Sequence, residues 1–204
     1  AHGANRLGGN GVANSTVYGG IAGDVMGRDI AAQPHLRDPD ENVIAAEIDR
    51  AMHPVGRQQG DIHGLRRELQ NVMWDDVGVM RDANGIKRGI ERIAALKLEM
   101  ETVGVASNNL AFNLSWHDWL NLQSLIHTSE VIAKAGLSRE NSRGAHFRED
   151  FPDAGPMDQS YFTVATDGDS GIEVSREAVK FTIVKPGESL LGADEAETLV
   201  GAAQ

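Results

Sequence analysis

The chain has 204 residues, of which 41% are hydrophobic and 24% are charged, and its formal net charge is −11. This composition excludes global disorder, and the length predicts one core with an appendage rather than two large domains. The acidic balance argues against a nucleic-acid surface, because such a surface needs clustered Lys and Arg. The absence of cysteine excludes disulfides, thiolate metal ligands and a catalytic thiol among these residues. No run of about 18 apolar residues occurs, so we expect no membrane span in this chain.

The first ten residues place a glycine turn and one guanidinium directly before a helix-like run. Gly8 and Gly9 would let a ligand approach the backbone closely, and Arg6 offers two parallel donors to a carboxylate or phosphate. Because a helix N-terminus also favours anions, the segment is a candidate anion site. An ordinary glycine-rich turn is the alternative that the pattern leaves open. Since the chain opens on Ala1 rather than Met, we expect a fragment of a longer protein that supplies the rest of this site.

Five helices are expected from apolar residues that recur every three or four positions. They span about residues 14–30, 40–52, 61–80, 84–102 and 115–136. The first is rich in glycine, which suggests a helix pressed against another surface, and a proline-containing break at 33–39 follows it. The last three are long, amphipathic and joined by short segments, so they predict a small helical bundle.

The character of the chain changes after residue 138. Short runs of β-branched and aromatic residues predict two strands, at 161–166 and 178–184, and residues 187–204 form an acidic tail rich in Ala and Gly. The predicted fold class is therefore mainly α. A three-helix-bundle-like domain is preceded by a turn and a helix and followed by short strands.

A second group of charged residues lies between residues 141 and 152, where Arg143, His146, Arg148 and Asp150 surround a glycine. Such density is compatible with an active site, but a buried or interfacial network of ion pairs is the interpretation that we favour. The remaining histidines lack the i, i+4 spacing of metal ligands on a helix, so we expect no metal site.

These two segments resemble motifs of the flavoprotein family of succinate dehydrogenase and fumarate reductase. Residues 2–10, His-Gly-Ala-Asn-Arg-Leu-Gly-Gly-Asn, are similar to that family's late FAD-contacting motif. Residues 142–146, Ser-Arg-Gly-Ala-His, with Arg148, Asp150 and the Phe-Pro that follows, are similar to the motif near the end of its helical C-terminal domain. The resemblance implies a C-terminal part of an FAD-dependent oxidoreductase. That family oxidises succinate to fumarate, or runs the reverse, by passing a hydride between the substrate carbon and flavin N5.

The resemblance also implies roles for individual residues. Arg6 matches the arginine that grips a substrate carboxylate, and Asn10, Gly11 and Val12 match positions that contact the flavin. The family usually has Ser and Leu at positions 11 and 12, so the hydroxyl contact to the flavin is lost here. Its dinucleotide-binding glycine motif and its proton-donating arginine belong to a preceding part. We therefore assign no catalytic residue in this chain and expect the isolated chain to be inactive.

On this resemblance, residues 1–33 would be the end of the FAD-binding domain, 34–155 the helical C-terminal domain, and 156–204 the strands and tail. L-aspartate oxidase is the nearest relative in the superfamily, since it shares the start His-Gly-Ala-Asn-Arg, and a fragment of that enzyme is one alternative. A second alternative is a non-catalytic helical module that docks an iron–sulfur partner. The implied partners are a dicarboxylate substrate and an iron–sulfur subunit. The implied location is cytoplasmic, either free or peripheral on the inner face of a membrane through that partner.

Overall fold

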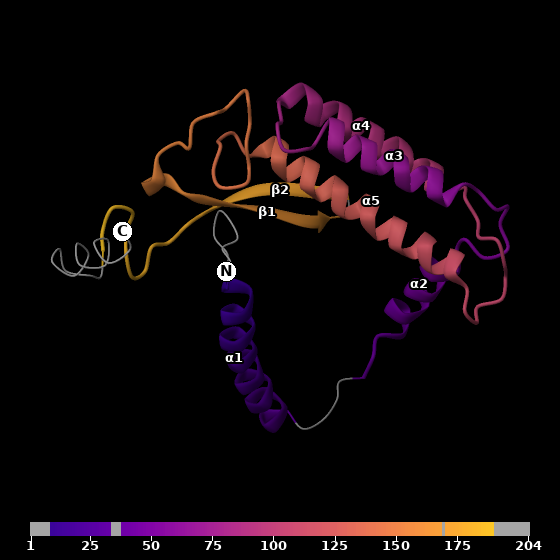
Figure 1. Cartoon of the computed structure of the whole chain (residues 1–204). Helices are drawn as coiled ribbons and strands as arrows, with labels where there is room; N and C mark the ends of the chain where they lie inside the picture. Colours follow the sequence, from indigo (N-terminus) through magenta and orange to yellow (C-terminus); the bar gives the residue numbers. More distant parts are fainter. Residues whose placement is uncertain (1–8, 34–37, 169, 190–204) are drawn as a thin grey trace.

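The structure is a computed structural model that describes residues 9–33, 38–168 and 170–189. These residues form five α-helices, one short 3-10 helix and a two-stranded sheet (Figure 1). In chain order the elements are α1 (Asn10–Ala32), α2 (Glu41–Met52), α3 (Ile62–Asp75), α4 (Ala83–Met100), α5 (Leu114–Ser138), η1 (Met157–Gln159), β1 (Tyr161–Gly168) and β2 (Gly171–Ala178). The mainly helical fold class predicted from the sequence is confirmed.

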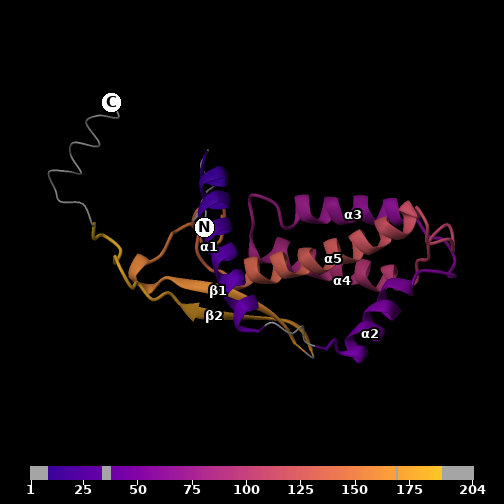
Figure 2. The same ribbon diagram turned by 90° about the horizontal axis from the view of Figure 1, so that it is seen from below.

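Helices α3, α4 and α5 lie side by side and bury the apolar core between them (Figures 1 and 2). Each contributes one stripe of side chains spaced by three, four or seven positions. The members are Ile62, Leu65, Leu69 and Val72 of α3, Ile86, Ile93, Leu96 and Met100 of α4, and Trp119, Leu122, Ile126 and Ala133 of α5. Trp119 is fully buried, and its indole Nε1 donates to the carbonyl of Val103 at 3.0 Å. A large apolar ring with its one donor satisfied stabilises the centre of the bundle.

The helix predicted at 61–80 begins as expected but ends earlier. Asp61 caps it by accepting a backbone N–H at 2.8 Å, and α3 stops just before Asp76. Asp76 turns into the bundle, where Arg88 and Arg92 of α4 donate to its two carboxylate oxygens at 3.0 and 2.8 Å. This pairing favours a turn over a further helical turn, so the predicted end of the helix was wrong.

Strands β1 and β2 form an antiparallel hairpin that packs against α5. Gly168 pairs with Gly171, whose φ of 98° lies in the left-handed region that favours glycine. The strand predicted at 161–166 is confirmed, but the prediction of the second strand at 178–184 was wrong, because β2 covers 171–178. The tight reversal places that segment directly beside β1, and a strand needs such a neighbour for its backbone hydrogen bonds.

Most of α1 stands apart from the bundle and the hairpin in Figure 1. Its large apolar side chains are all exposed: Val12, Val17, Tyr18, Ile21, Val25, Met26 and Ile30. A Cβ added at any of its interior glycines, which are Gly19, Gly20, Gly23 and Gly27, would meet no atom within 4 Å. The helix predicted here is confirmed. The surface that we expected to cover it is not found among the described residues.

Candidate functional site

The N-terminal candidate site lies only partly within the described residues. Arg6 lies outside them, and so does the side chain of Asn10. Gly9 precedes α1 with a φ of 84°, in the left-handed region, and a Cβ added there would meet nothing within 4 Å. The turn therefore leaves open space beside its backbone.

Helix α1 begins at Asn10 rather than at residue 14, so Gly11 and Val12 belong to its first turn. No side chain caps the helix, and the Val12 N–H donates to the Gly9 carbonyl at 3.1 Å. The Val12 side chain is 75% exposed. The Ala13 N–H also donates to the Gly9 carbonyl, so this end of the helix offers mainly the positive end of the helix dipole.

Arg148 is the most deeply buried charged side chain of the second group, with 1% of its surface exposed. Its Nε and Nη2 donate to the two carboxylate oxygens of Asp150, each at 2.7 Å. Its Nη1 donates to the carbonyls of Gly136 and Leu137, at the C-terminal end of α5, at 2.9 and 3.0 Å. The guanidinium thus satisfies carbonyls that a helix end leaves unpaired, and it interacts favourably with the helix dipole.

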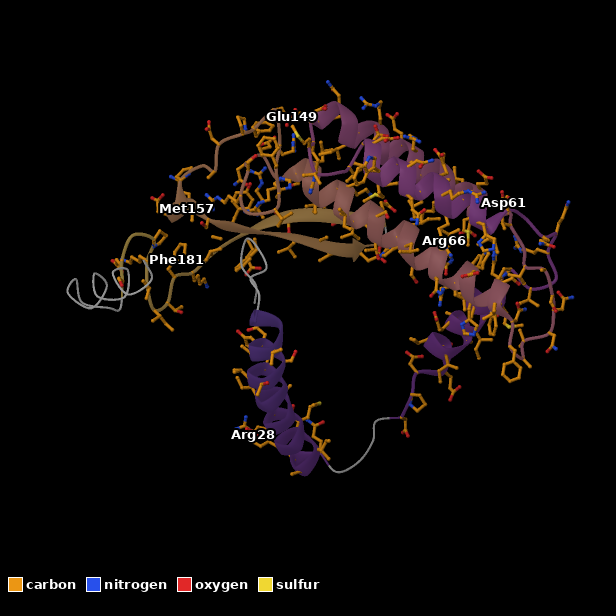
Figure 3. All side chains as sticks on the ribbon, in the orientation of Figure 1. Arg28, Asp61, Arg66, Glu149, Met157 and Phe181 are labelled. Atoms are coloured by element: carbon orange, nitrogen blue, oxygen red, sulfur yellow. The ribbon has the colours of Figure 1, made fainter. Side chains whose placement is uncertain are left out.

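Asp150 connects this arginine to the start of α4. Its second oxygen also accepts the backbone N–H of Ala83, the first residue of α4, at 2.9 Å. The hydrogen bonds from Arg148 and, to a smaller extent, from this N–H lower the pKa of Asp150 to about 2. The ionised pair therefore joins the end of α5 to the beginning of α4. Figure 3 shows Glu149, the residue between the two partners, at this end of the bundle.

His146 is half-buried, and both of its ring nitrogens have partners. Nδ1 lies 3.2 Å from Arg81 Nη1, and Nε2 lies 3.1 Å from the Arg139 carbonyl. Since an arginine can only donate and a carbonyl can only accept, we assign a neutral ring with its proton on Nε2. Burial lowers the pKa of His146, and the charges of Arg81, Arg139 and Arg148 lower it further, against the carbonyl hydrogen bond, which raises it. With both nitrogens engaged, His146 links two segments and is not a free base.

Arg143 holds the turn-rich segment that leads to β1. Its Nε donates to the Ala154 carbonyl at 2.5 Å, its Nη2 to the Pro156 carbonyl at 2.8 Å, and its Nη1 to the Ser160 hydroxyl at 2.8 Å. Together with the contacts of Arg148, these bonds favour a network that connects segments of the fold over an active site.

Residues 66–190 match the family model described as the fumarate reductase flavoprotein C-terminal region. The chain belongs to this family. The fumarate reductase flavoprotein C-terminal region spans most of α3, all of α4 and α5, the network around Arg148, and the hairpin. The resemblance inferred from the two motifs is confirmed.

Individual relatives extend this likeness. A fumarate reductase flavoprotein subunit of Haemophilus influenzae is 27% identical over 206 residues, which cover 100% of this chain and 34% of that protein. An uncharacterised FAD-dependent oxidoreductase of Methanocaldococcus jannaschii is 35% identical over 156 residues, or 74% of this chain and 27% of that protein. An L-aspartate oxidase of Yersinia pestis is 32% identical over 155 residues, which cover 74% of this chain and 26% of that protein. The chain thus spans between 26% and 34% of the length of these relatives, and L-aspartate oxidase is among them, as the sequence predicts.

The family's fold is also seen in a solved structure. A quinol-fumarate reductase with menaquinol molecules superposes with a TM-score of 0.78 and 24% identity, covering 89% of this chain and 32% of that one. At this identity the likeness shows the fold. Over the described ranges of the present chain, no helix is long and apolar enough to span a membrane.

Sequence reasoning missed Arg81 and Arg139, which this flavoprotein region brings to the network from outside the motif. Arg81 lies in the loop before α4 and meets Arg148 across an isolated parallel bridge, while Arg139 directly follows α5. No spacing rule links residue 81 to the motif, because the two meet only through the tertiary fold. The position of Arg139 just beyond a predicted helix end was the one available signal, since basic residues there interact with the helix dipole.

Proposed function

We propose that the chain is the C-terminal part of an FAD-dependent oxidoreductase that interconverts succinate and fumarate. The observation that carries this proposal is the family membership of residues 66–190, joined to the alignment of the whole chain with a fumarate reductase flavoprotein subunit. When bound, FAD supplies the hydride donor or acceptor for the substrate carbon. Because the chain covers 34% of that relative, the remaining parts of the site would come from other residues of a longer polypeptide.

Within this proposal the start of the chain holds substrate and cofactor. Arg6 binds a substrate carboxylate, since a guanidinium can donate two parallel hydrogen bonds to it and so orient the reacting carbon. Asn10, Gly11 and Val12 lie against the flavin. The N-terminus of α1 supports this role, because the positive end of its helix dipole would stabilise negative charge on a reduced ring.

The rest of the chain has a supporting role in the proposal. Residues 1–33 complete an FAD-binding domain, 34–155 form the helical C-terminal domain, and 156–204 form the strands and tail. The charged network holds the ends of α4 and α5 together, so the bundle presents a rigid body to the flavin domain. An iron–sulfur subunit is the proposed electron partner, and the assembly would be peripheral to a membrane. The name of the Haemophilus influenzae relative, a flavoprotein subunit, supports a multisubunit assembly.

The test is the substitution Arg6→Ala in a longer polypeptide that contains this chain, with Arg28→Ala as the matched control. Arg28 is an exposed arginine of α1 (Figure 3), so both variants lose one guanidinium. A charge-assisted hydrogen bond contributes about 1.5–3 kcal/mol, so two of them predict a loss of about 100-fold or more in kcat/KM for fumarate in Arg6→Ala. The flavin absorbance should persist in both variants, and Arg28→Ala should retain turnover.

Three outcomes would contradict the proposal in different ways. Equal turnover in the two variants would remove Arg6 from the substrate site. Turnover of L-aspartate without turnover of succinate or fumarate would assign the chain to L-aspartate oxidase, which the relative of 32% identity supports. A longer polypeptide that binds no flavin would leave the second alternative, a helical module that docks an iron–sulfur partner.

A further inference from the structure

An open pocket of about 540 Å³ lies between the C-terminal end of α5, the turn that contains His146, and the start of β1. Arg81, Arg139 and Arg143 line it together with His146, and none of the lining residues is acidic. We call it the arginine pocket. It brings one arginine from each of three segments to a single opening.

Within the described residues, the three arginines of this pocket have polar partners but no carboxylate. Arg139 donates to the Tyr161 carbonyl and the Thr163 hydroxyl, both at 3.2 Å, and its guanidinium lies 4.9 Å from the Tyr161 ring centre. Arg81 donates from Nε to a loop carbonyl at 2.6 Å, and Arg143 donates to two carbonyls and one hydroxyl. Other arginines in the described part of the chain form salt bridges, but none of those salt bridges includes Arg81, Arg139 or Arg143.

The lack of a carboxylate beside the three arginines in the described structure is unexpected, because the chain carries a net charge of −11. The carbonyls at the end of α5 do not neutralise the pocket, since Arg148 already binds them, and Asp150 is paired with that same arginine. Burial and the charge of Arg148 lower the pKa of Arg81, and the arginines around His146 disfavour its protonation. An excess of positive charge therefore remains at a partly buried opening, where Coulomb interactions are stronger than in bulk water.

We propose that the arginine pocket binds a small oxyanion, a phosphate or a carboxylate. A guanidinium has five N–H donors in a planar fork, so Arg139 and Arg143 each have more donors than the contacts above use. Such forks bind oxyanions through paired, charge-assisted hydrogen bonds. The Thr163 hydroxyl, which accepts from Arg139, can donate its own proton to the same ligand. This site goes beyond the proposed function, which uses residues at the start of the chain for substrate and flavin.

The test is a titration of the 204-residue chain with sodium phosphate and, separately, with sodium succinate. Sodium chloride keeps the ionic strength constant, and backbone amide chemical shifts report binding. We expect saturable binding with a Kd of about 1 mM or tighter, with the largest shifts at residues 139–146 and 160–163. The anion that binds more tightly identifies whether phosphate or carboxylate is the preferred chemistry.

Two variants distinguish anion binding in the pocket from a general effect of positive charge. Arg139→Gln should weaken binding by about tenfold or more, because a charge-assisted hydrogen bond contributes about 1.5–3 kcal/mol. Arg67→Gln, at an exposed position of α3 outside the pocket, removes the same charge and should leave the Kd unchanged. Equal weakening in both variants, or no saturable shift with either anion, would overturn the proposal. If Arg139→Gln does not fold, the chemical shifts of the unmodified chain test the proposal. Saturable shifts that lie outside the pocket would overturn it.

Discussion

The substitution Arg148→Met tests whether the buried guanidinium holds the ends of α4 and α5 together. It would leave the Asp150 carboxylate without its bidentate partner and the carbonyls of Gly136 and Leu137 without a donor. Removing one member of a buried ion pair costs about 3–5 kcal/mol. Asp150 would keep its bond from the Ala83 N–H, and its side chain is 31% exposed, so water recovers part of the loss. We therefore expect a decrease of about 2–4 kcal/mol in the free energy of unfolding.

Urea unfolding followed by tryptophan fluorescence measures this decrease, because Trp119 is fully buried in the bundle. The control is Arg50→Met, which breaks the exposed pair of Arg50 with Glu47 and should cost less than about 1 kcal/mol. A cost below about 1 kcal/mol for Arg148→Met, or one equal to that of the control, would refute the reasoning. The double variant Arg148→Met/Asp150→Asn should recover stability relative to Arg148→Met, because it no longer leaves an unpaired charge.

Other consequences of the fold can be checked on the same chain. The folded pKa of Asp150, about 2, is below its unfolded value, so its contribution is present above pH 4 and is lost as the pH falls toward 2. Because water screens this partly exposed side chain, the contribution is reduced to about 1–2 kcal/mol, and Asp150→Asn should flatten this part of the melting-temperature profile. Gly89→Ala should destabilise by about 1–3 kcal/mol, since the new Cβ would lie 2.8 Å from Val77 Cγ2. Gly23→Ala, which meets open space in α1, should instead raise helicity measured by circular dichroism. Amides of α1 should exchange with deuterium faster than those of α5 in this chain, because the large apolar side chains of α1 are exposed.

Local rules predicted the helices better than their ends. Apolar spacing locates α3, α4 and α5 and places Ile86, Ile93 and Trp119 in the core. The same spacing extends to Met80, which is 62% exposed in the structure. Periodicity could not show that Asp76 would pair with two arginines of the next helix, and this ion pair overrides the local pattern.

In the charged network, too, contacts between residues close in the sequence could be predicted, and contacts formed by the tertiary fold could not. Arg148 and Asp150 are two residues apart, so their pairing could be anticipated from the motif. Arg81 reaches the same place because its carbonyl accepts the Glu149 N–H at 2.7 Å, a contact between segments far apart in the sequence. The arginine pocket therefore could not be predicted from the sequence, although Arg143, one of its three arginines, lies inside a motif that the sequence displays.

The composition of α1 is typical of a helix that packs against another layer of the protein. Each interior glycine costs about 1 kcal/mol of helix stability relative to alanine, and α1 has four of them beside exposed Val, Ile, Met and Tyr side chains. Most of the stability of a helix in a protein comes from the packing of an apolar face rather than from intrinsic propensity. Glycines are tolerated, and exposed apolar side chains are useful, when a neighbouring layer approaches the helix closely. The flavin domain that we propose would supply such a layer, and it would meet α1 near the positive end of its helix dipole. Amides of α1 that remain unprotected in the longer polypeptide would remove this support for the proposal.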